Sequence, residues 1–153
     1  MHFSLRPYRK EDFQILHSLD QSCFPPGIAF PRHVLRNYLH LPTACCQIAE
    51  GDGKLAGLVL SAHGEDRGTI ITLDVAIEFR RRGVGSALLA AAEQHFAEEI
   101  IRDIEIQVST QDAAAVAFWT HHGYRTQDTL KDYYQKGQDA YAMVKRLPIN
   151  KEP

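Results

Sequence analysis

Residues 73–89 read LDVAIEFRRRGVGSALL. The first five residues are apolar or β-branched except for one aspartate, which predicts a strand. Three arginines and Gly-Val-Gly follow, and the alanine- and leucine-rich segment after them predicts a helix. Glycine lets the backbone approach an anion closely, and the first turn of a helix offers free N–H groups and a partial positive charge. The stretch therefore predicts a phosphate-binding turn between a strand and a helix.

Length and composition indicate an ordinary globular protein. The chain has 153 residues, of which 44% are hydrophobic and 24% charged, so we expect a single domain over residues 1–153 with a core from about residue 3 to residue 147. The formal net charge of -2 gives no reason to expect a nucleic-acid partner. The basic cluster Arg80 to Arg82 is local, which favours a compact anionic ligand over a polymer.

Cysteine and histidine usage argues against disulfides and metals. Three cysteines are an odd number, and the neighbours Cys45 and Cys46 would rarely pair with each other, so we expect free thiols. The eight histidines show no His-x-x-x-His spacing and the cysteines no Cys-x-x-Cys spacing, so we expect no metal. The first residues lack the apolar run of a signal peptide and no stretch reaches transmembrane length, which predicts a cytoplasmic protein with no membrane partner.

Hydrophobic periodicity and turn residues predict a mixed α/β layer fold. The long helix after Gly83 is expected to cross over between adjacent strands, and Gly51-Asp52-Gly53 to close a hairpin. The expected strands cover residues 3–6, 44–50, 54–62, 69–77 and 104–108 and a final pair within 124–147 that breaks near residue 137, and the expected helices cover residues 10–19, 32–39, 84–97 and 112–121.

The turn Arg80-Arg81-Arg82-Gly83-Val84-Gly85 fits the pattern Arg/Gln-x-x-Gly-x-Gly. It is neither a Walker A loop, because Lys-Ser/Thr is missing, nor a dinucleotide fingerprint, because the third glycine is missing. Residues 73–89 resemble the acetyl-CoA signature of the GCN5-related N-acetyltransferase (GNAT) superfamily. Residues 108–124, VSTQDAAAVAFWTHHGY, resemble the second motif of that family.

Two shorter pieces resemble the ribosomal-protein-alanine and Ard1-type N-terminal acetyltransferases. Tyr133-Tyr134 with the segment 139–147 is similar to their C-terminal hairpin, and Phe24-Pro25-Pro26 stands where they place a substrate loop. The resemblance implies the α/β GNAT fold, a mixed, mostly antiparallel sheet of about seven strands flanked by about four helices, with strands 4 and 5 splayed around the cofactor. It also implies that Phe24, Pro25 and Tyr133 contact the substrate.

The same resemblance implies acetyl-CoA as cofactor and acetyl donor. The strand before the turn would pair with the pantetheine arm, the turn would hold the pyrophosphate, and the backbone N–H of Val75 would meet the thioester carbonyl. The implied cofactor-binding residues are Leu73, Val75, Ile77, Arg80, Arg81, Arg82, Gly83, Val84, Gly85, Ser86, Asp112 and Trp119.

The chain departs from the family where the chemistry takes place. Trp119 stands where many members have a tyrosine acid, and an indole does not release its proton near neutral pH. Gln107 replaces the usual glutamate or histidine base, and Asp112 replaces an asparagine. The remaining candidates for catalysis are therefore Gln107, Tyr133 and Tyr134, although the two tyrosines also fit a structural pair on a strand.

Other titratable residues fit structural roles better than catalytic ones. Asp74 is expected to be an exposed strand carboxylate or to pair with Arg80 to Arg82, and a role as base is the weaker alternative. His121 and His122 fall at a helix C-terminus, where histidine is favourable for the helix dipole.

These features together predict an acetyl-CoA-dependent N-acetyltransferase that moves the acetyl group directly to a primary amine in a ternary complex. The favoured acceptor is a protein or peptide N-terminal amine, and the protein is expected to be a monomer or a homodimer. Two alternatives stay open: an acetyltransferase for a small amine or amino acid, and a CoA-binding module with weak or no transfer activity.

Overall fold

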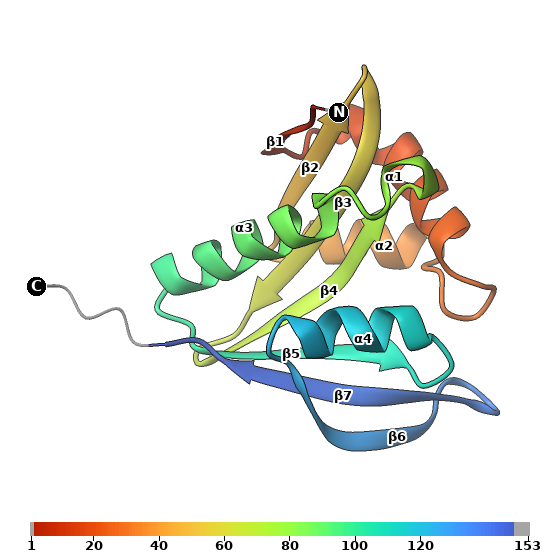
Figure 1. The fold of residues 1–153 in the computed structure, drawn as a ribbon, viewed down its shortest axis with the longest axis vertical. Coiled ribbons are helices and arrows are strands. Elements are labelled where there is room, and N and C mark those ends of the chain that lie inside the picture. Colours follow the sequence, from red (N-terminus) through yellow and green to blue (C-terminus); the bar gives the residue numbers. More distant parts are fainter. Residues whose placement is uncertain (1, 149–153) are drawn as a thin grey trace, which may run out of the picture.

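One mixed sheet organises the molecule, in the strand order β1-β2-β3-β4-β5-β7-β6 (Figure 1). The computed structural model describes residues 2–148. The strands are β1 Ser4–Pro7, β2 Cys45–Gly51, β3 Lys54–His63, β4 Arg67–Val75, β5 Asp103–Ser109, β6 Arg125–Gln135 and β7 Gln138–Arg146. The helices are α1 Phe13–Cys23, α2 Arg32–Leu39, α3 Val84–Glu98 and α4 Ala113–His121, with short 3-10 turns η1 Lys10–Asp12 and η2 Ile77–Phe79.

The first part of the sheet is an antiparallel meander, as the sequence predicts. β2 and β3 are joined by a two-residue turn in which Asp52 and Gly53 have φ angles of 53° and 72°. Two successive positive φ angles are typical of the tight turns whose twist matches that of the flanking strands. The predicted hairpin is therefore confirmed.

The sheet opens between β4 and β5, which are its parallel pair. Pairing is limited to three positions, Arg67 with Asp103, Gly68 with Ile104 and Thr69 with Glu105. Beyond Thr69 the two strands separate, and helix α3 makes the crossover between them. This confirms the expected splayed strands and the GNAT arrangement of sheet and helices.

Each helix packs one side against the sheet through buried apolar side chains. Figure 1 shows α3 in front of β2, β3 and β4 and α2 behind them. Val84, Leu88 and Phe96 of α3 are at most 1% exposed. The ring of Phe96 fills the space above Gly68, where a Cβ would lie 2.5 Å from it, so a side chain at this position would displace the helix.

Several predicted boundaries differ from the structure. β4 ends at Val75, and Ile77 lies in η2 with 78% of its surface exposed. The reason is that Phe79 turns into the core, at 2% exposure, so the chain must leave the sheet before Ile77. Helix α1 begins at Phe13 after the turn η1 and continues to Cys23.

Asp74 also differs from the expectation, because its side chain is buried at 1% exposure and makes no ion pair with the arginines in the part of the chain that the structure describes. No helix within residues 2–148 is long and apolar enough to cross a membrane.

Candidate active site

Two cavities meet where β4 and β5 separate. The turn cavity, of about 400 Å³, is lined by the end of β4, the turn before α3 and one side of α4. The loop cavity, of about 410 Å³, is lined by the segment between α1 and α2, by β5 and by the β6–β7 hairpin. The residues that line both cavities are Phe24, Leu73, Asp112, Ala115 and Trp119. A ligand that fills the turn cavity can therefore extend into the loop cavity.

The turn before α3 has the geometry of an anion site. Gly83 is the N-cap of α3 with φ of +84°, and no side chain caps the helix. Arg81 is also left-handed, with φ of 61°. Together these two residues place the free N–H groups of the first turn of α3 at the cavity that Arg80, Arg81 and Ser86 line. Backbone donors and guanidinium groups thus converge on one space.

Arg80 is held in place by the end of β4. Its Nε donates to the carbonyl oxygen of Val75 at 3.1 Å, and its Nη2 lies 3.8 Å from Sγ of Cys23. This side chain therefore lines the turn cavity while it ties the turn to α1.

The edge of β4 that faces the gap keeps the N–H of Val75 available. The N–H of Ala76 donates to the carbonyl oxygen of Ala56 on β3 at 2.8 Å. Neighbouring residues of an antiparallel strand direct their backbone groups to opposite edges, so the N–H and C=O of Val75 point towards β5. Because β5 has already separated here, the N–H of Val75 faces the cavities, whereas its carbonyl oxygen already accepts from Nε of Arg80 and Sγ of Cys23.

Helix α4 forms the opposite wall of the turn cavity with one side of its first two turns. Phe118 lies against Gly85, where a Cβ would be 3.2 Å from the ring. Trp119 is 8% exposed and packs edge to face on Phe118 and Tyr124. Asp112 caps the helix by accepting from the N–H of Ala115 at 3.0 Å. Phe118 was missed from sequence, although it directly precedes the predicted Trp119 on the same helix.

The loop between α1 and α2 forms one side of the loop cavity through Phe24, Pro25, Ile28 and Phe30. A backbone turn closes it, with the N–H of Ile28 donating to the carbonyl oxygen of Pro25 at 3.1 Å. Its far end is fixed by Gln21, whose Nε2 donates to the carbonyl oxygen of Phe30 at 2.7 Å. Hydrogen bonds thus hold the loop in a defined conformation, and the predicted residues Phe24 and Pro25 line the cavity from it.

Gln107 lies on the opposite side of the loop cavity, on β5. Its Nε2 donates to Oε2 of Glu105 at 3.3 Å. A carboxylate only accepts hydrogen bonds, so this contact turns the amide nitrogen towards Glu105 and leaves Oε1 as an acceptor for a group in the cavity. Glu105 also lies 3.6 Å from Nη1 of Arg67. Glu105 had no signal in the sequence.

The two tyrosines of β6 separate in the structure. Tyr134 lines the loop cavity, and burial raises the pKa of its hydroxyl to about 12. Tyr133 is 49% exposed, lies outside both cavities and packs edge to face on Tyr134. Asp132 explains the arrangement, because its φ of 54° and the irregular pairing after Leu130 turn the strand.

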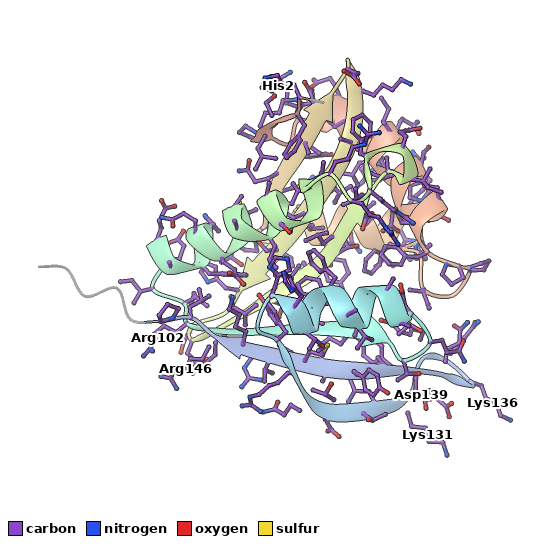
Figure 2. All side chains as sticks on the ribbon, viewed as in Figure 1. His2, Arg102, Lys131, Lys136, Asp139 and Arg146 are labelled. Atoms are coloured by element: carbon purple, nitrogen blue, oxygen red, sulfur yellow. The ribbon has the colours of Figure 1, made fainter. Side chains whose placement is uncertain are left out.

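Hydrogen bonds close the tip of this hairpin. Asp132 donates its N–H to the carboxylate of Asp139 at 2.8 Å and accepts from the N–H of Gly137 at 2.7 Å. Figure 2 shows Lys131 and Lys136 extending away from the strands at this end of the molecule. The hairpin therefore presents Tyr134 to the cavity and its lysines to solvent.

Four of the residues that the resemblance implied are not brought to the cavities. Ile77 is exposed on η2 beside α1, and Val84 is buried in the core at 1% exposure. Arg82 is exposed beside the turn but outside the lining of both cavities, and Tyr133 also lies outside both. Within residues 2–148 no group of three or more histidines, cysteines, aspartates or glutamates is arranged to hold a metal ion.

Comparison with known proteins places this geometry in a family. An uncharacterized N-acetyltransferase of Methanocaldococcus jannaschii is 28% identical over 97% of this chain and 95% of its own length. An N-alpha-acetyltransferase of Sulfurisphaera tokodaii is 25% identical over 95% and 93%. The crystal structure of Ard1 from Thermoplasma volcanium superposes with a TM-score of 0.88 at 19% identity and covers 97% of this chain and all of that one. Residues 13–124 match the acetyltransferase (GNAT) family, and the chain belongs to it.

Proposed function

We propose that this acetyltransferase moves an acetyl group from acetyl-CoA to the N-terminal amine of a protein or peptide, by direct transfer in a ternary complex. The observation that carries the proposal is the junction of the two cavities at the gap between β4 and β5, which gives a donor and an acceptor a common meeting point. Direct transfer needs such a meeting point, since most of the rate gain comes from holding the two reactants together.

The turn cavity suits a CoA pyrophosphate. Its ligands would be the N–H groups that follow Gly83, the hydroxyl of Ser86 and the guanidinium of Arg81. The backbone groups of Leu73 at the open edge of β4 would pair with an amide of a pantetheine arm, which leaves the N–H of Val75 to the acyl group. Acetyl-CoA would supply an activated acyl group on a thiol leaving group, whose ordinary pKa is about 8.5.

The loop cavity suits a peptide terminus better than a small polyvalent cation. Among the described residues that line it, Asp112 is the only carboxylate, and that carboxylate already caps α4. The remaining wall is apolar or neutral, as a peptide's first side chain requires. The N-alpha-acetyltransferase of Sulfurisphaera tokodaii among the relatives supports the same acceptor.

Three groups of this chain would act on the reacting atoms. The Oε1 of Gln107 would accept a hydrogen bond from the amine and orient it, while the released proton would pass to water. The N–H of Val75 would stabilise the oxyanion on the acyl carbon. The hydroxyl of Tyr134 would donate to the sulfur of the leaving thiolate, because a phenol with a pKa of about 12 stays protonated at neutral pH.

The test uses the full chain with acetyl-CoA and a panel of peptides that differ in their first residue. We expect free thiol to form and tandem mass spectrometry to place the acetyl group on the α-amine. The control peptides carry a blocked N-terminus and an internal lysine. No turnover over a broad panel would exclude the peptide acceptor, and stabilisation by acetyl-CoA without thiol release from any amine would favour the CoA-binding module.

We also propose a cytoplasmic location for this reaction and a monomer or homodimer as the working unit. The free thiols of Cys23, Cys45 and Cys46 support a reducing compartment. Light scattering on the purified protein tests the oligomeric state.

A further inference from the structure

Two buried carboxyl groups lie side by side beneath the turn cavity. Asp20 of α1 is 0% exposed and Asp74 of β4 is 1% exposed. One oxygen of each has a donor: Oδ2 of Asp20 accepts from the N–H of Phe30 at 2.7 Å, and Oδ1 of Asp74 accepts from Oγ1 of Thr72 at 2.5 Å. The other two oxygens, Oδ1 of Asp20 and Oδ2 of Asp74, are buried without a hydrogen-bond donor among the described residues.

Two unpaired carboxylates at this depth would be very costly, because burial penalises each charge and the two charges repel. A single proton between the two donorless oxygens removes one charge and satisfies both atoms. The two side chains are within hydrogen-bonding reach of each other. We propose that Asp20 and Asp74 share one proton, and that this carboxylic acid–carboxylate bond fixes the loop between α1 and α2 to strand β4.

The contacts assign the proton to Asp74. Burial, followed by the neighbouring Asp20, raises the pKa of Asp74 well above its usual range, and this outweighs the opposite effect of the Thr72 hydroxyl. The other titratable groups that face the pair are Arg80 at the turn, Cys23 on α1 and Cys46 on β2. Arg80 is the one cation among these described groups, and its guanidinium is bonded to Val75 and Cys23 instead.

The shared proton would position both reactants of the proposed reaction. Asp20 holds Phe30, at the end of the loop that lines the acceptor side, and its carbonyl oxygen accepts from the N–H of Phe24 at 3.2 Å. Asp74 lies between Leu73 and Val75, the two residues at the open edge of β4. This functional part rests on the proposed acetyl transfer, whereas the shared proton itself does not.

Asparagine substitutions test the proton directly, because they keep the shape of the side chain. In D74N the amide can donate to Asp20, and in D20N the amide can accept from Phe30 and donate to an ionised Asp74. Each single variant thus replaces the titrating proton with a fixed N–H. In the double variant, both amide oxygens stay with Phe30 and Thr72, and two NH2 groups face each other.

The measurement is thermal unfolding of the full chain between pH 4.5 and pH 8.5, with the fluorescence of the single tryptophan, Trp119, as a second readout. The folded protein keeps a proton on Asp74 that the unfolded chain releases above a pKa of about 3.9, so wild-type stability falls as pH rises. We expect both single variants to lack this fall and to exceed the wild-type Tm by about 5 °C at pH 8. The double variant should melt below both single variants throughout.

Exposed Asp66 in the β3–β4 turn provides the control, since D66N makes the same Asp-to-Asn replacement at a surface position without a shared proton and should shift Tm equally at every pH. Single variants that follow the wild-type pH dependence, or a double variant that equals the sum of the singles, would overturn the shared proton. None of these readouts requires acetyl transfer. If the Tm values follow the expected pH dependence but the protein transfers no acetyl group to any peptide, the proposed function is refuted and the shared proton is still supported.

Discussion

The hydroxyl oxygen of Ser86 lies 3.0 Å from Nε2 of His122, and this contact joins the first turn of α3 to the end of α4. The imidazole also packs against the ring of Phe118, with centroids 4.6 Å apart. Burial, followed by the neighbouring His121, lowers the pKa of His122 below its usual 6.5. At neutral pH the ring is therefore uncharged, and the tautomer with its proton on Nε2 donates to the oxygen of Ser86. The serine O–H then stays free to donate to a phosphate in the turn cavity.

Replacing His122 by alanine should weaken acetyl-CoA binding by about threefold to tenfold, the effect of one lost hydrogen bond. Wild-type affinity should also rise as pH falls below 6.5, because protonated His122 adds a positive charge beside the phosphates. Isothermal titration calorimetry at pH 7.5 and pH 5.5 measures both effects. The His121→Ala variant is the control, and an equal loss of affinity in it would contradict a specific role of His122.

Gly83→Glu should abolish acetyl-CoA binding, because it puts a carboxylate at the N-terminus of α3 where the pyrophosphate would lie. Gly53→Glu is a matched control. Both glycines have positive φ, 84° and 72°, and both have open space where a Cβ would be. The two variants therefore carry similar backbone strain, and they differ in distance from the cavity. Equal acetyl-CoA affinities in a thermal-shift titration would refute the phosphate site.

The sequence predicted the parts of the fold that depend on local pattern. Gly51-Asp52-Gly53 was enough for the hairpin, and the glycine turn with its following helix was enough for the crossover. Local pattern could not predict where β4 ends, since that depends on the distant packing of Phe79 in the core. Local pattern also predicted an exposed Asp74. It could not show that Asp20, which interacts with Asp74, comes from a different element, helix α1.

Alternation along a strand predicted that Tyr133 and Tyr134 face opposite ways, but not which of them faces the site. The irregular turn of the chain at Asp132 decides this. Similarly, a sequence comparison shows that Gln107 is not a base, whereas only the structure shows the Glu105 carboxylate next to it. The hydrogen bond between Gln107 and Glu105 depends on the side-chain conformations of both residues, which the sequence does not specify.

Tyr134→Phe should lower kcat by about tenfold or more, because the leaving thiolate would lose a hydrogen-bond donor. The matched variant Tyr133→Phe removes the same atom from the neighbouring ring outside the cavities and should leave kcat within about twofold of wild type. Since burial raises the pKa of Tyr134 to about 12, the pH–rate profile of the wild type should show no loss from this group up to pH 10. A larger defect in Tyr133→Phe would reverse the assignment.

Glu105→Gln should lower kcat while it leaves the KM for acetyl-CoA nearly unchanged. A glutamine at position 105 can donate as well as accept, so the amide of Gln107 would no longer be held with Oε1 towards the cavity. We expect a loss of about tenfold, the cost of one misoriented hydrogen bond in the transition state. Steady-state kinetics with a saturating peptide measures it, and Glu105→Asp should recover part of the loss.

Arg67→Gln separates this positioning role from a simple effect on the strands. Arg67 is the other partner of Glu105, at 3.6 Å, and its side chain is 55% exposed. Exposed ion pairs of this kind contribute about 1 kcal/mol or less, so this variant should fold normally and keep its kcat. If Arg67→Gln lost as much activity as Glu105→Gln, the carboxylate would act by holding β4 and β5 together. If it retains activity while Glu105→Gln does not, Glu105 acts through the orientation of Gln107.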